Sequence, residues 1–375
     1  MVKRFTIIAS ILGVSLILIS WGSVGHYKIS DLCSLSFNSE MSEFNDWIPY
    51  LRDHASDADK RKSSDPTEGK KHYIDIDNYN DFVSNGSIEQ YYVAAVAKYS
   101  LTTVKNNGIL PWATVTTFDS LKNCLKRKDI TKAKQFAADL GHYVGDGHMP
   151  LHITANYDGK STGNNGIHSR YESSMIDTYN SEITYTGETI SEITDVSQYV
   201  FNYIYANNKY VDSILFADNY AVNLAGGTRS KSTYNSSTYK QALWNKTKVY
   251  TTMLFKNASH ALAELIYTAW IQAGRPSLTA TSVEQNTQYT EALEQNFPNP
   301  FTNYTSITYN LNENANVLLQ VKDILGNSIT TLHEGFQTPG SYSVDWTPKN
   351  QPEGIYFIVL DTKKQHQVKK MLLVK

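Results

Sequence analysis

Residues 129–152 read DITKAKQFAADLGHYVGDGHMPLH and combine a helical pattern with a dense group of histidines. Apolar side chains recur there at spacings of three and four, with one step of a single residue: Ile130, Ala133, Phe136, Ala137, Leu140 and Tyr143. This period predicts an amphipathic α-helix over residues 129–143. Because Pro150 cannot continue a helix, we expect the helix to break there and His152 to point in a new direction.

Two acid–histidine pairs in and after this stretch indicate a metal site. His142 and Asp146 are four residues apart and therefore share one face of the predicted helix. His168 and Glu172 repeat that spacing 26 residues later, with His152 between the pairs. Each pair supplies half of a tetrahedral zinc site, and adding His152 to the second pair leaves a fourth position open. One such pair alone is more often a surface ion pair, but the combination favours metal binding.

Further candidate ligands lie nearer the N-terminus. Asp57 and Asp59 occur in HASDADKR (54–61), and His72 opens HYID (72–75). If the mature chain begins at Trp21, its free α-amine can bind zinc once it is deprotonated. His26 is close enough in sequence to complete that site.

The remaining histidines carry less weight. His148 lies six residues after His142, off the shared helix face, so we expect it to be structural or to support a ligand. We expect His54 to be an ordinary helix residue. No partner in the sequence is evident for the others, which are His260, His333 and His366.

The N-terminus and the overall charge indicate an exported protein. The chain has 375 residues and a formal charge of −2, which gives no support for a strongly basic nucleic-acid surface but does not exclude a local patch. Lys3 and Arg4 precede an apolar run at residues 7–19, which is short for a membrane span of about 20 residues. We predict a signal peptide at residues 1–20, because this pattern is typical of secretory signals.

Two parts with different periodicities follow. Residues 21–277 are predicted to be mainly helical, with a second long helix over 239–274 that Gly274 and Pro276 end. Residues 278–294 are polar and are interpreted as a linker. Short strand-like runs separated by Gly, Pro and Asn then predict a β-sandwich over 295–375. These runs are Ser306–Leu311, Val317–Asp323, Ser328–His333, Gly340–Trp346, Gly354–Asp361 and Val368–Val374.

The two cysteines, Cys33 and Cys124, leave two alternatives open. In an exported protein an even pair can form a disulfide, but two buried thiols are equally compatible with the sequence. Neither cysteine lies in a CxxC motif or near the histidines, so we do not expect them to bind metal.

Taken in order, the motifs of residues 21–274 resemble the phospholipase C/S1–P1 nuclease superfamily of zinc enzymes. They are an N-terminal Trp followed by His, an Ala-Asp element, HYID, HxxxDxxxPLH and HxxxE. The resemblance implies a mainly α fold and three zinc ions. The first would be held by Asp59, His72, His142 and Asp146. The second would be held by His152, His168 and Glu172, and the third by Trp21, His26 and the bridging Asp146.

The resemblance also implies phosphodiester hydrolysis by metal-activated water. Asp59 is then a candidate base as well as a ligand, and Asp57 remains the alternative at this position. Arg61 and Arg170 are weaker candidates for holding the phosphate. A third zinc ion can stabilise the leaving oxygen, so no protein acid is required.

The substrate signals are divided between the two branches of this superfamily. The spacing of five from Trp21 to His26 resembles the nucleases. Glu172 in place of Asp, and the spacing of 16 from His152 to His168, resemble bacterial phospholipases C. We expect a phospholipase C-like enzyme first and an S1/P1-type single-strand nuclease or 3′-nucleotidase second. A non-catalytic surface binding protein on a degenerate zinc scaffold is a remote third.

The C-terminal part is similar to the sorting domain of the type IX secretion system. The resemblance rests on QNFPNPF (295–301), DILG (323–326), GSY (340–342), GIYF (354–357) and KKM (369–371). It implies passage through the outer membrane by that machinery, and a secreted or cell-surface protein. We infer no stable protein partner from the sequence.

Overall fold

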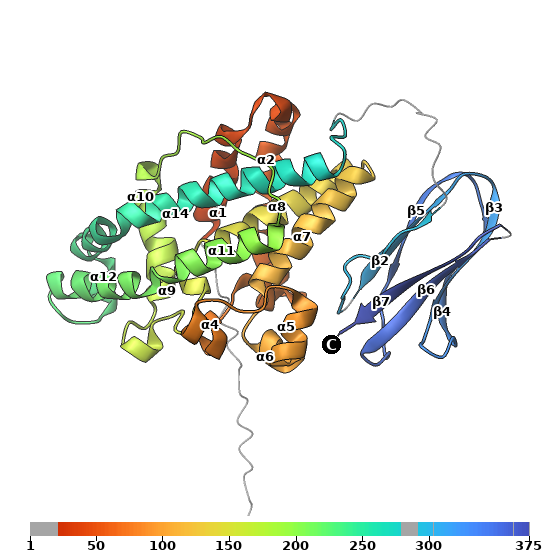
Figure 1. The fold of residues 1–375 in the computed structure, drawn as a ribbon. Helices are drawn as coiled ribbons and strands as arrows, with labels where there is room; N and C mark the ends of the chain where they lie inside the picture. Colours follow the sequence, from red (N-terminus) through yellow and green to blue (C-terminus); the bar gives the residue numbers. More distant parts are fainter. Residues whose placement is uncertain (1–21, 279–291, 303, 363, 375) are drawn as a thin grey trace, which may run out of the picture. The chain divides into compact units, whose positions relative to one another are not determined.

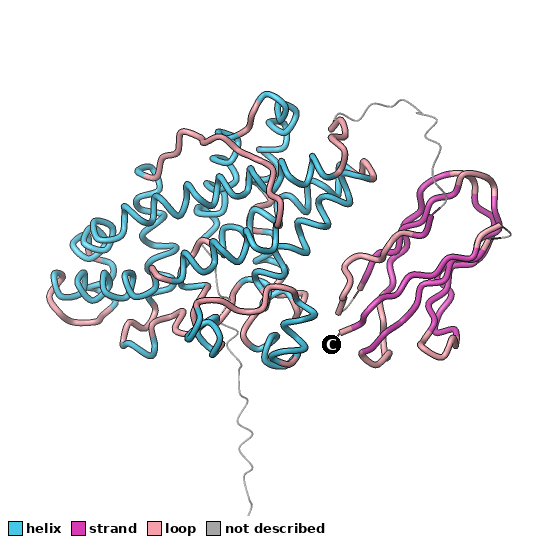
Figure 2. Tube along the Cα trace, viewed as in Figure 1, coloured by secondary structure: helices cyan, strands magenta, loops and turns pink. Residues whose placement is uncertain are grey.

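The computed structural model describes residues 22–278, 292–302, 304–362 and 364–374. Helices occupy the described residues up to Gln272, and strands occupy those from Ala292 onward (Figures 1 and 2). The expected order, a mainly α part followed by an all-β part, is therefore confirmed. The predicted signal peptide, Trp21 and most of the predicted linker lie outside the described residues. The boundaries 21–277 and 295–375 are kept as proposed domain limits.

The first part is built from short and long helices. The α-helices are α1 (Gly22–Cys33), α2 (Ile48–Asp53), α3 (Asp57–Arg61), α4 (Asn80–Asn85), α5 (Tyr92–Tyr99), α6 (Leu101–Asn106), α7 (Leu110–Lys126), α8 (Ile130–Gly147), α9 (Ile167–Ser169), α10 (Ile176–Tyr179), α11 (Val196–Asn208), α12 (Val211–Leu224), α13 (Lys231–Asn235) and α14 (Ser237–Gln272). Short 3₁₀ turns include η3 (Glu68–His72) and η5 (Pro150–His152), and η7 (Arg170–Met175) is a π-helix. Among the described residues, no helix has both the length and the apolar character needed to cross a membrane.

Helix α8 is the predicted helix of the opening stretch, extended to Gly147. The Asp129 carboxylate caps its start by accepting a hydrogen bond from the backbone N–H of Lys132 over 3.1 Å. Its first half is amphipathic, whereas every residue from Leu140 to the end of the helix is buried. As expected, the helix ends before Pro150, which opens the separate turn η5. The candidate ligands of α8, His142 and Asp146, are therefore carried by its buried half.

Helix α14 confirms the second predicted long helix, with bounds shifted by two residues. Gly274 takes the left-handed conformation at φ 88°, and its N–H bonds the Ile271 carbonyl over 2.9 Å. The N–H of Arg275 then bonds the carbonyl of Trp270 over 2.9 Å. This pair of bonds satisfies the last carbonyls of the helix and requires a residue that tolerates positive φ, which explains the stop at Gly274.

The second part is a sandwich of two antiparallel sheets, as predicted. One sheet has the order β1-β2-β5 and the other β4-β3-β6-β7. The strands are β1 (Ala292–Leu293), β2 (Thr305–Leu311), β3 (Ala315–Lys322), β4 (Ser328–Gln337), β5 (Gly340–Trp346), β6 (Gly354–Asp361) and β7 (His366–Leu373). Every predicted run is a strand, with ends that move by up to four residues, and β1 was not predicted because two residues carry no pattern. The core includes Ile307, Tyr309, Leu319, Val321, Ile358 and Met371.

The cysteines correspond to the buried-thiol alternative. Cys33 and Cys124 are both free and buried. The Cys33 thiol donates to the Ser30 carbonyl over 3.1 Å within α1. Burial raises the pKa of both thiols, that of Cys124 to about 11, so neither is a reactive thiolate.

Candidate metal centre

Three groups of His, Asp and Glu side chains are arranged so that each can hold a metal ion. We call them the His26 group (His26, His142, Asp146), the Asp59 group (Asp59, His72, His142) and the Glu172 group (His152, His168, Glu172). Within each group the ligand atoms lie within 4.8 Å of one another. Apart from Asp59, which is partly exposed, every member is buried. The described candidates from the sequence are thus brought together from α1, α3, η3, α8, η5, α9 and η7.

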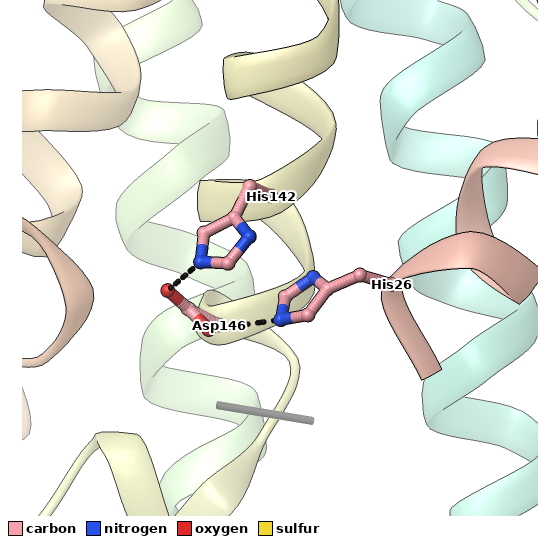
Figure 3. Close-up of side chains that lie close together, drawn as sticks. All are labelled: His26, His142 and Asp146. Carbon is pink, nitrogen blue, oxygen red and sulfur yellow. Dashed lines mark ion pairs between the residues drawn. The ribbon is translucent and has the colours of Figure 1, made fainter. Parts of the chain in front are cut away.

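Asp146 is the junction of these groups. Its Oδ2 lies 3.0 Å from Nδ1 of His72 and 3.3 Å from Nε2 of His142. Its Oδ1 lies 3.5 Å from Nε2 of His26 and 3.8 Å from Nδ1 of His152. His142 lies one turn before Asp146 on α8, and His26 reaches the same carboxylate from α1 (Figure 3). One fully buried carboxylate therefore presents different oxygens to different histidines, as a bridging ligand requires.

The approach of α1 to α8 depends on Gly145. A Cβ atom at this position would lie 2.9 Å from Nδ1 of His26, closer than such atoms normally come. Without it, the His26 ring stacks on His142 with centroids 3.9 Å apart and planes 13° apart. Gly145 is absent from the predicted site residues. The only signal for it was its place between the two predicted ligands of α8.

Backbone carbonyls fix the tautomers of three histidines. Nδ1 of His142 donates to the Ala55 carbonyl over 2.7 Å. Nδ1 of His152 donates to the carbonyl of His72 over 2.5 Å, and Nδ1 of His168 to that of Tyr157 over 3.4 Å. Each neutral ring then carries its lone pair on Nε2, which faces carboxylate oxygens. Such a pair of acceptors needs a positive charge between them, either a proton on the imidazole or a metal ion, so these residues fit a metal ion.

The His72 ring has the opposite orientation to these three histidines, with Nδ1 rather than Nε2 toward the cluster. Its Nδ1 faces the cluster, and its Nε2 lies 3.5 Å from Oε1 of the buried Glu68. Glu68 also accepts a hydrogen bond from Tyr143 and pairs with Lys71 over 2.7 Å. Burial alone would raise the pKa of Glu68, but His72, Lys71 and Arg61 hold it well below its usual range. Glu68 is thus an ionised carboxylate next to the outer nitrogen of His72, which no hydrogen bond satisfies, and Glu68 was not among the predicted residues.

The structure distinguishes Asp59 from Asp57. Oδ1 of Asp59 lies 3.5 Å from His72 Nδ1 and 3.6 Å from His142 Nε2. Asp57 instead pairs with Lys60 over 2.7 Å and with His54 over 2.5 Å, and its side chain is one-third exposed. Asp59 is therefore the member of this pair that belongs to the cluster.

The Glu172 group is held by an irregular helix. His168 is the middle residue of the single turn α9 and Glu172 lies in the π-helix η7, yet Nε2 of His168 is 3.2 Å from Oε1 of Glu172, as their shared face predicted. Oε2 of Glu172 lies 3.3 Å from Nε2 of His152. His168 Nε2 and Glu172 Oε1 are buried atoms that no hydrogen bond satisfies. Such facing orphan atoms are expected where a metal ion is the missing partner.

The electrostatics of the cluster favour cations. Burial alone would lower the pKa of His142, but Asp146 and Asp59 outweigh it and raise that pKa to about 10. Burial would likewise raise the pKa of Asp146, yet His142 and His152 hold it well below its usual range. The same negative potential that retains a proton on His142 attracts a divalent ion. Buried imidazole and carboxylate ligands in these proportions are those that zinc prefers.

Some predicted residues take other roles. The Arg170 guanidinium is buried against Asp218 and does not correspond to the suggested phosphate contact. Arg61 pairs with Asp139 over 3.0 Å and with Glu68, and its suggested phosphate contact stays a prediction. His148 is structural, as expected: its Nδ1 donates to the Val144 carbonyl over 2.8 Å and its ring stacks on Tyr203. Trp21 lies outside the described residues.

Comparisons with known proteins identify families that match the two parts of the chain. Residues 21–297 match the family described as S1/P1 Nuclease, and residues 295–375 match the one described as Secretion system C-terminal sorting domain. No curated protein matches the chain. Among solved structures, it is similar to the alpha toxin from Clostridium absonum, with 12% identity, a TM-score of 0.40 and coverage of 95% of this chain and 96% of that one. It is also similar to the Clostridium perfringens alpha-toxin from avian strain SWCP, with 10% identity, a TM-score of 0.36 and coverage of 94% and 97%.

Proposed function

Since the chain belongs to the S1/P1 nuclease family of hydrolases, we propose that it is a secreted three-zinc phosphodiesterase that cleaves single-stranded nucleic acid. One observation carries this proposal. The buried Asp146 carboxylate faces histidines of two candidate metal groups and lies 3.8 Å from the ring of His152 in the third, so that ions bound there would be close enough to act on one phosphate.

The proposed ligands are those brought together in the three groups, with Asp146 shared and the α-amine and carbonyl of Trp21 added beside His26. When bound, the ions lower the pKa of a coordinated water and neutralise charge on the phosphoryl oxygens. The protein residues orient this centre. Asp59 is the most exposed member of the groups, at 15% for its side chain, and is therefore placed to accept a proton from the attacking water.

The nuclease branch is our first candidate, although the sequence motifs alone ranked a phospholipase C-like enzyme first. The family match supports this choice. A half-buried Tyr157 beside His168, with ring centroids 5.8 Å apart, offers an aromatic surface to a base. The phospholipase C-like activity remains the second candidate, because Glu172 and its spacing from His152 favour it.

The test uses mature protein that begins at Trp21, with zinc counted and two substrates assayed in parallel. We expect about three zinc ions per chain and cleavage of single-stranded DNA or RNA. The same zinc content with release of phosphorylated head group from phosphatidylcholine would move the enzyme to the phospholipase branch. Fewer than two ions and no activity on either substrate would contradict the proposal. That result would favour the third alternative, a non-catalytic surface binding protein on a degenerate zinc scaffold.

Lys62 is a cation beside the Asp59 group, and we propose that it contacts the substrate phosphate. Its Nζ lies 2.6 Å from Oδ1 of Asp59, and its side chain is only 14% exposed. Replacing Lys62 with Gln should lower kcat/KM by about 10- to 100-fold, because a charge-assisted bond to a phosphoryl oxygen is lost. Zinc content should stay at the wild-type value, and Lys62→Arg should retain more activity.

The matched control is Lys60→Gln, which removes an exposed ammonium that pairs with Asp57 instead. It should leave kcat/KM unchanged. Loss of zinc from the Lys62→Gln protein, or wild-type kinetics, would show that Lys62 does not act on substrate.

The sorting domain indicates secretion or display at the cell surface. We propose that the signal peptide is removed after Ser20, that the type IX machinery exports the chain, and that Trp21 then joins the His26 group. The packing of Gly22, at φ 47°, supports the last of these steps. A Cβ atom added at Gly22 would lie 3.3 Å from Oγ of Ser173, the residue after Glu172. The start of α1 is therefore packed beside the metal centre.

One extra residue before Trp21 should therefore damage the centre. The extension converts the α-amine into an amide, which cannot bind zinc. We expect one zinc ion to be lost and activity to fall by about tenfold or more. Zinc content and rate equal to those of the protein that begins at Trp21 would remove the amine from the ligand set.

A further inference from the structure

A buried ion pair between Arg170 and Asp218 lies behind the Glu172 group. Arg170 opens the π-helix η7, and Asp218 lies on α12. Nη2 of Arg170 donates to Oδ1 of Asp218 over 2.9 Å, and Asp218 is fully buried. Loss of the Asp218 charge would leave the Arg170 guanidinium buried without the carboxylate that neutralises it, whereas Asp218 also pairs with Arg229.

The rest of the Arg170 guanidinium binds the turn that precedes the ligand His168. Nη1 donates to the Asn165 carbonyl over 2.6 Å, and Nη2 donates to that of Asn164 over 3.1 Å. Gly166 completes this turn at φ 80°, and a Cβ atom there would lie 2.9 Å from Nη1. The turn is therefore shaped to receive this guanidinium.

Asp218 connects the same turn to two long helices. Its Oδ2 accepts hydrogen bonds from Nδ2 of Asn164 and from Nη1 of Arg229, both over 2.7 Å. Its Oδ1 accepts a hydrogen bond from the hydroxyl of Tyr239, on α14, over 2.5 Å. One carboxylate thus ties the turn before α9, through Arg170 and Asn164, to α12 and α14.

From these contacts we infer that Arg170 and Asp218 are positioning residues that hold His168 and Glu172 in register for one metal ion. Arg170 lies between the two ligands in sequence and directs its guanidinium to Asp218 on α12. The side chains of His168 and Glu172 instead point toward each other. A π-helix is rare and usually short, and η7 carries both Arg170 and the candidate ligand Glu172. Fixing Arg170 therefore keeps the orphan atoms His168 Nε2 and Glu172 Oε1 facing each other at 3.2 Å, while Oε2 of Glu172 faces Nε2 of His152. This inference rests on the zinc centre proposed above.

The test measures zinc retention in the mature protein. Asp218→Asn keeps the shape of the side chain but removes the charge that holds Arg170. We expect zinc at one of three sites to bind about 10- to 100-fold more weakly against a competing zinc-binding dye, with the other two sites unchanged. Arg170→Gln should behave in the same way. Arg170→Lys should restore part of the affinity, because it keeps the charge but cannot reach both Asp218 and the two carbonyls.

The matched control is Glu264→Gln, in a buried network of α14 that contacts Ser191, Tyr199 and His260 and no member of the three groups. It should lower the Tm of the zinc-free protein, as Asp218→Asn should, while leaving all three zinc affinities at the wild-type value. Equal weakening of all three sites in Asp218→Asn, or no weakening, would overturn the positioning role. A wild-type protein with fewer than three zinc ions would instead contradict the proposed function itself.

Discussion

Replacing Asp146 with Asn is expected to remove more than one zinc ion and to abolish hydrolysis. The two carboxylate oxygens face His72 and His142 on one side and His26 on the other, within 3.5 Å. An amide keeps the size of the side chain, but it has no negative charge and offers one of its two positions as a donor. We expect zinc to fall from the proposed three ions per chain to about one. Activity should fall by more than the roughly 100-fold seen when a group that only supports a ligand is removed.

Asp57→Asn is the control for this variant. Asp57 is two residues before Asp59 in the sequence, but its carboxylate pairs with Lys60 and His54. It should keep all its zinc and its rate. The two measurements separate the roles of Asp146. Loss of a single ion with a tenth of the wild-type activity would mean that this carboxylate is an ordinary ligand and that the ions are not bridged by it.

The parts of this centre that the sequence predicted share a simple geometry. His142 with Asp146, and His168 with Glu172, are four residues apart, and this spacing places two side chains on one helical face whatever the rest of the fold does. Their short distances in the structure confirm it. The break at Pro150 was predictable for the same reason, because proline excludes a helical hydrogen bond locally.

The contacts between elements could not be predicted in this way. Gly145 admits the His26 ring because α1 crosses α8 at that point, and nothing in the local sequence states which helix will cross there. Glu68 lies beside His72 in the same short turn, but its hydrogen bond with Tyr143 joins residues 75 positions apart, on η3 and α8. Similarly, the tautomers of His142 and His152 are set by backbone carbonyls 87 and 80 residues away.

For Arg170, the sequence suggested a role that the structure does not support. An arginine between two predicted ligands was a reasonable candidate for binding phosphate, since guanidinium groups suit that task. The structure buries it against Asp218, which lies 48 residues further along the chain and has no motif of its own. Sequence spacing therefore identified which residues lie near the centre, but not the direction in which each side chain points.

Removing zinc with a chelator should destabilise the helical part of the protein by a large amount. At a thousandfold excess of free zinc over Kd, one site stabilises the folded state by about 4 kcal/mol. For a unit of this size about 1 kcal/mol corresponds to about 2–4 °C in Tm, so a single site accounts for roughly 8–16 °C. Calorimetry with and without chelator measures this shift. The sandwich provides an internal control, because none of the three groups includes its described residues.

The size of the shift should depend on pH. In the zinc-free protein the pKa of His142 is raised to about 10 by Asp146 and Asp59, which outweigh its burial. A raised folded-state pKa gives stability that is fully present below the unfolded value near 6.5 and is lost as pH rises toward 10. In the zinc-bound protein His142 is already neutral, and binding strengthens as competing protons leave. The chelator should therefore lower Tm more at pH 9 than at pH 6.5. An equal shift at both pH values would mean that protons and zinc do not compete for His142, which would place that histidine outside the metal centre.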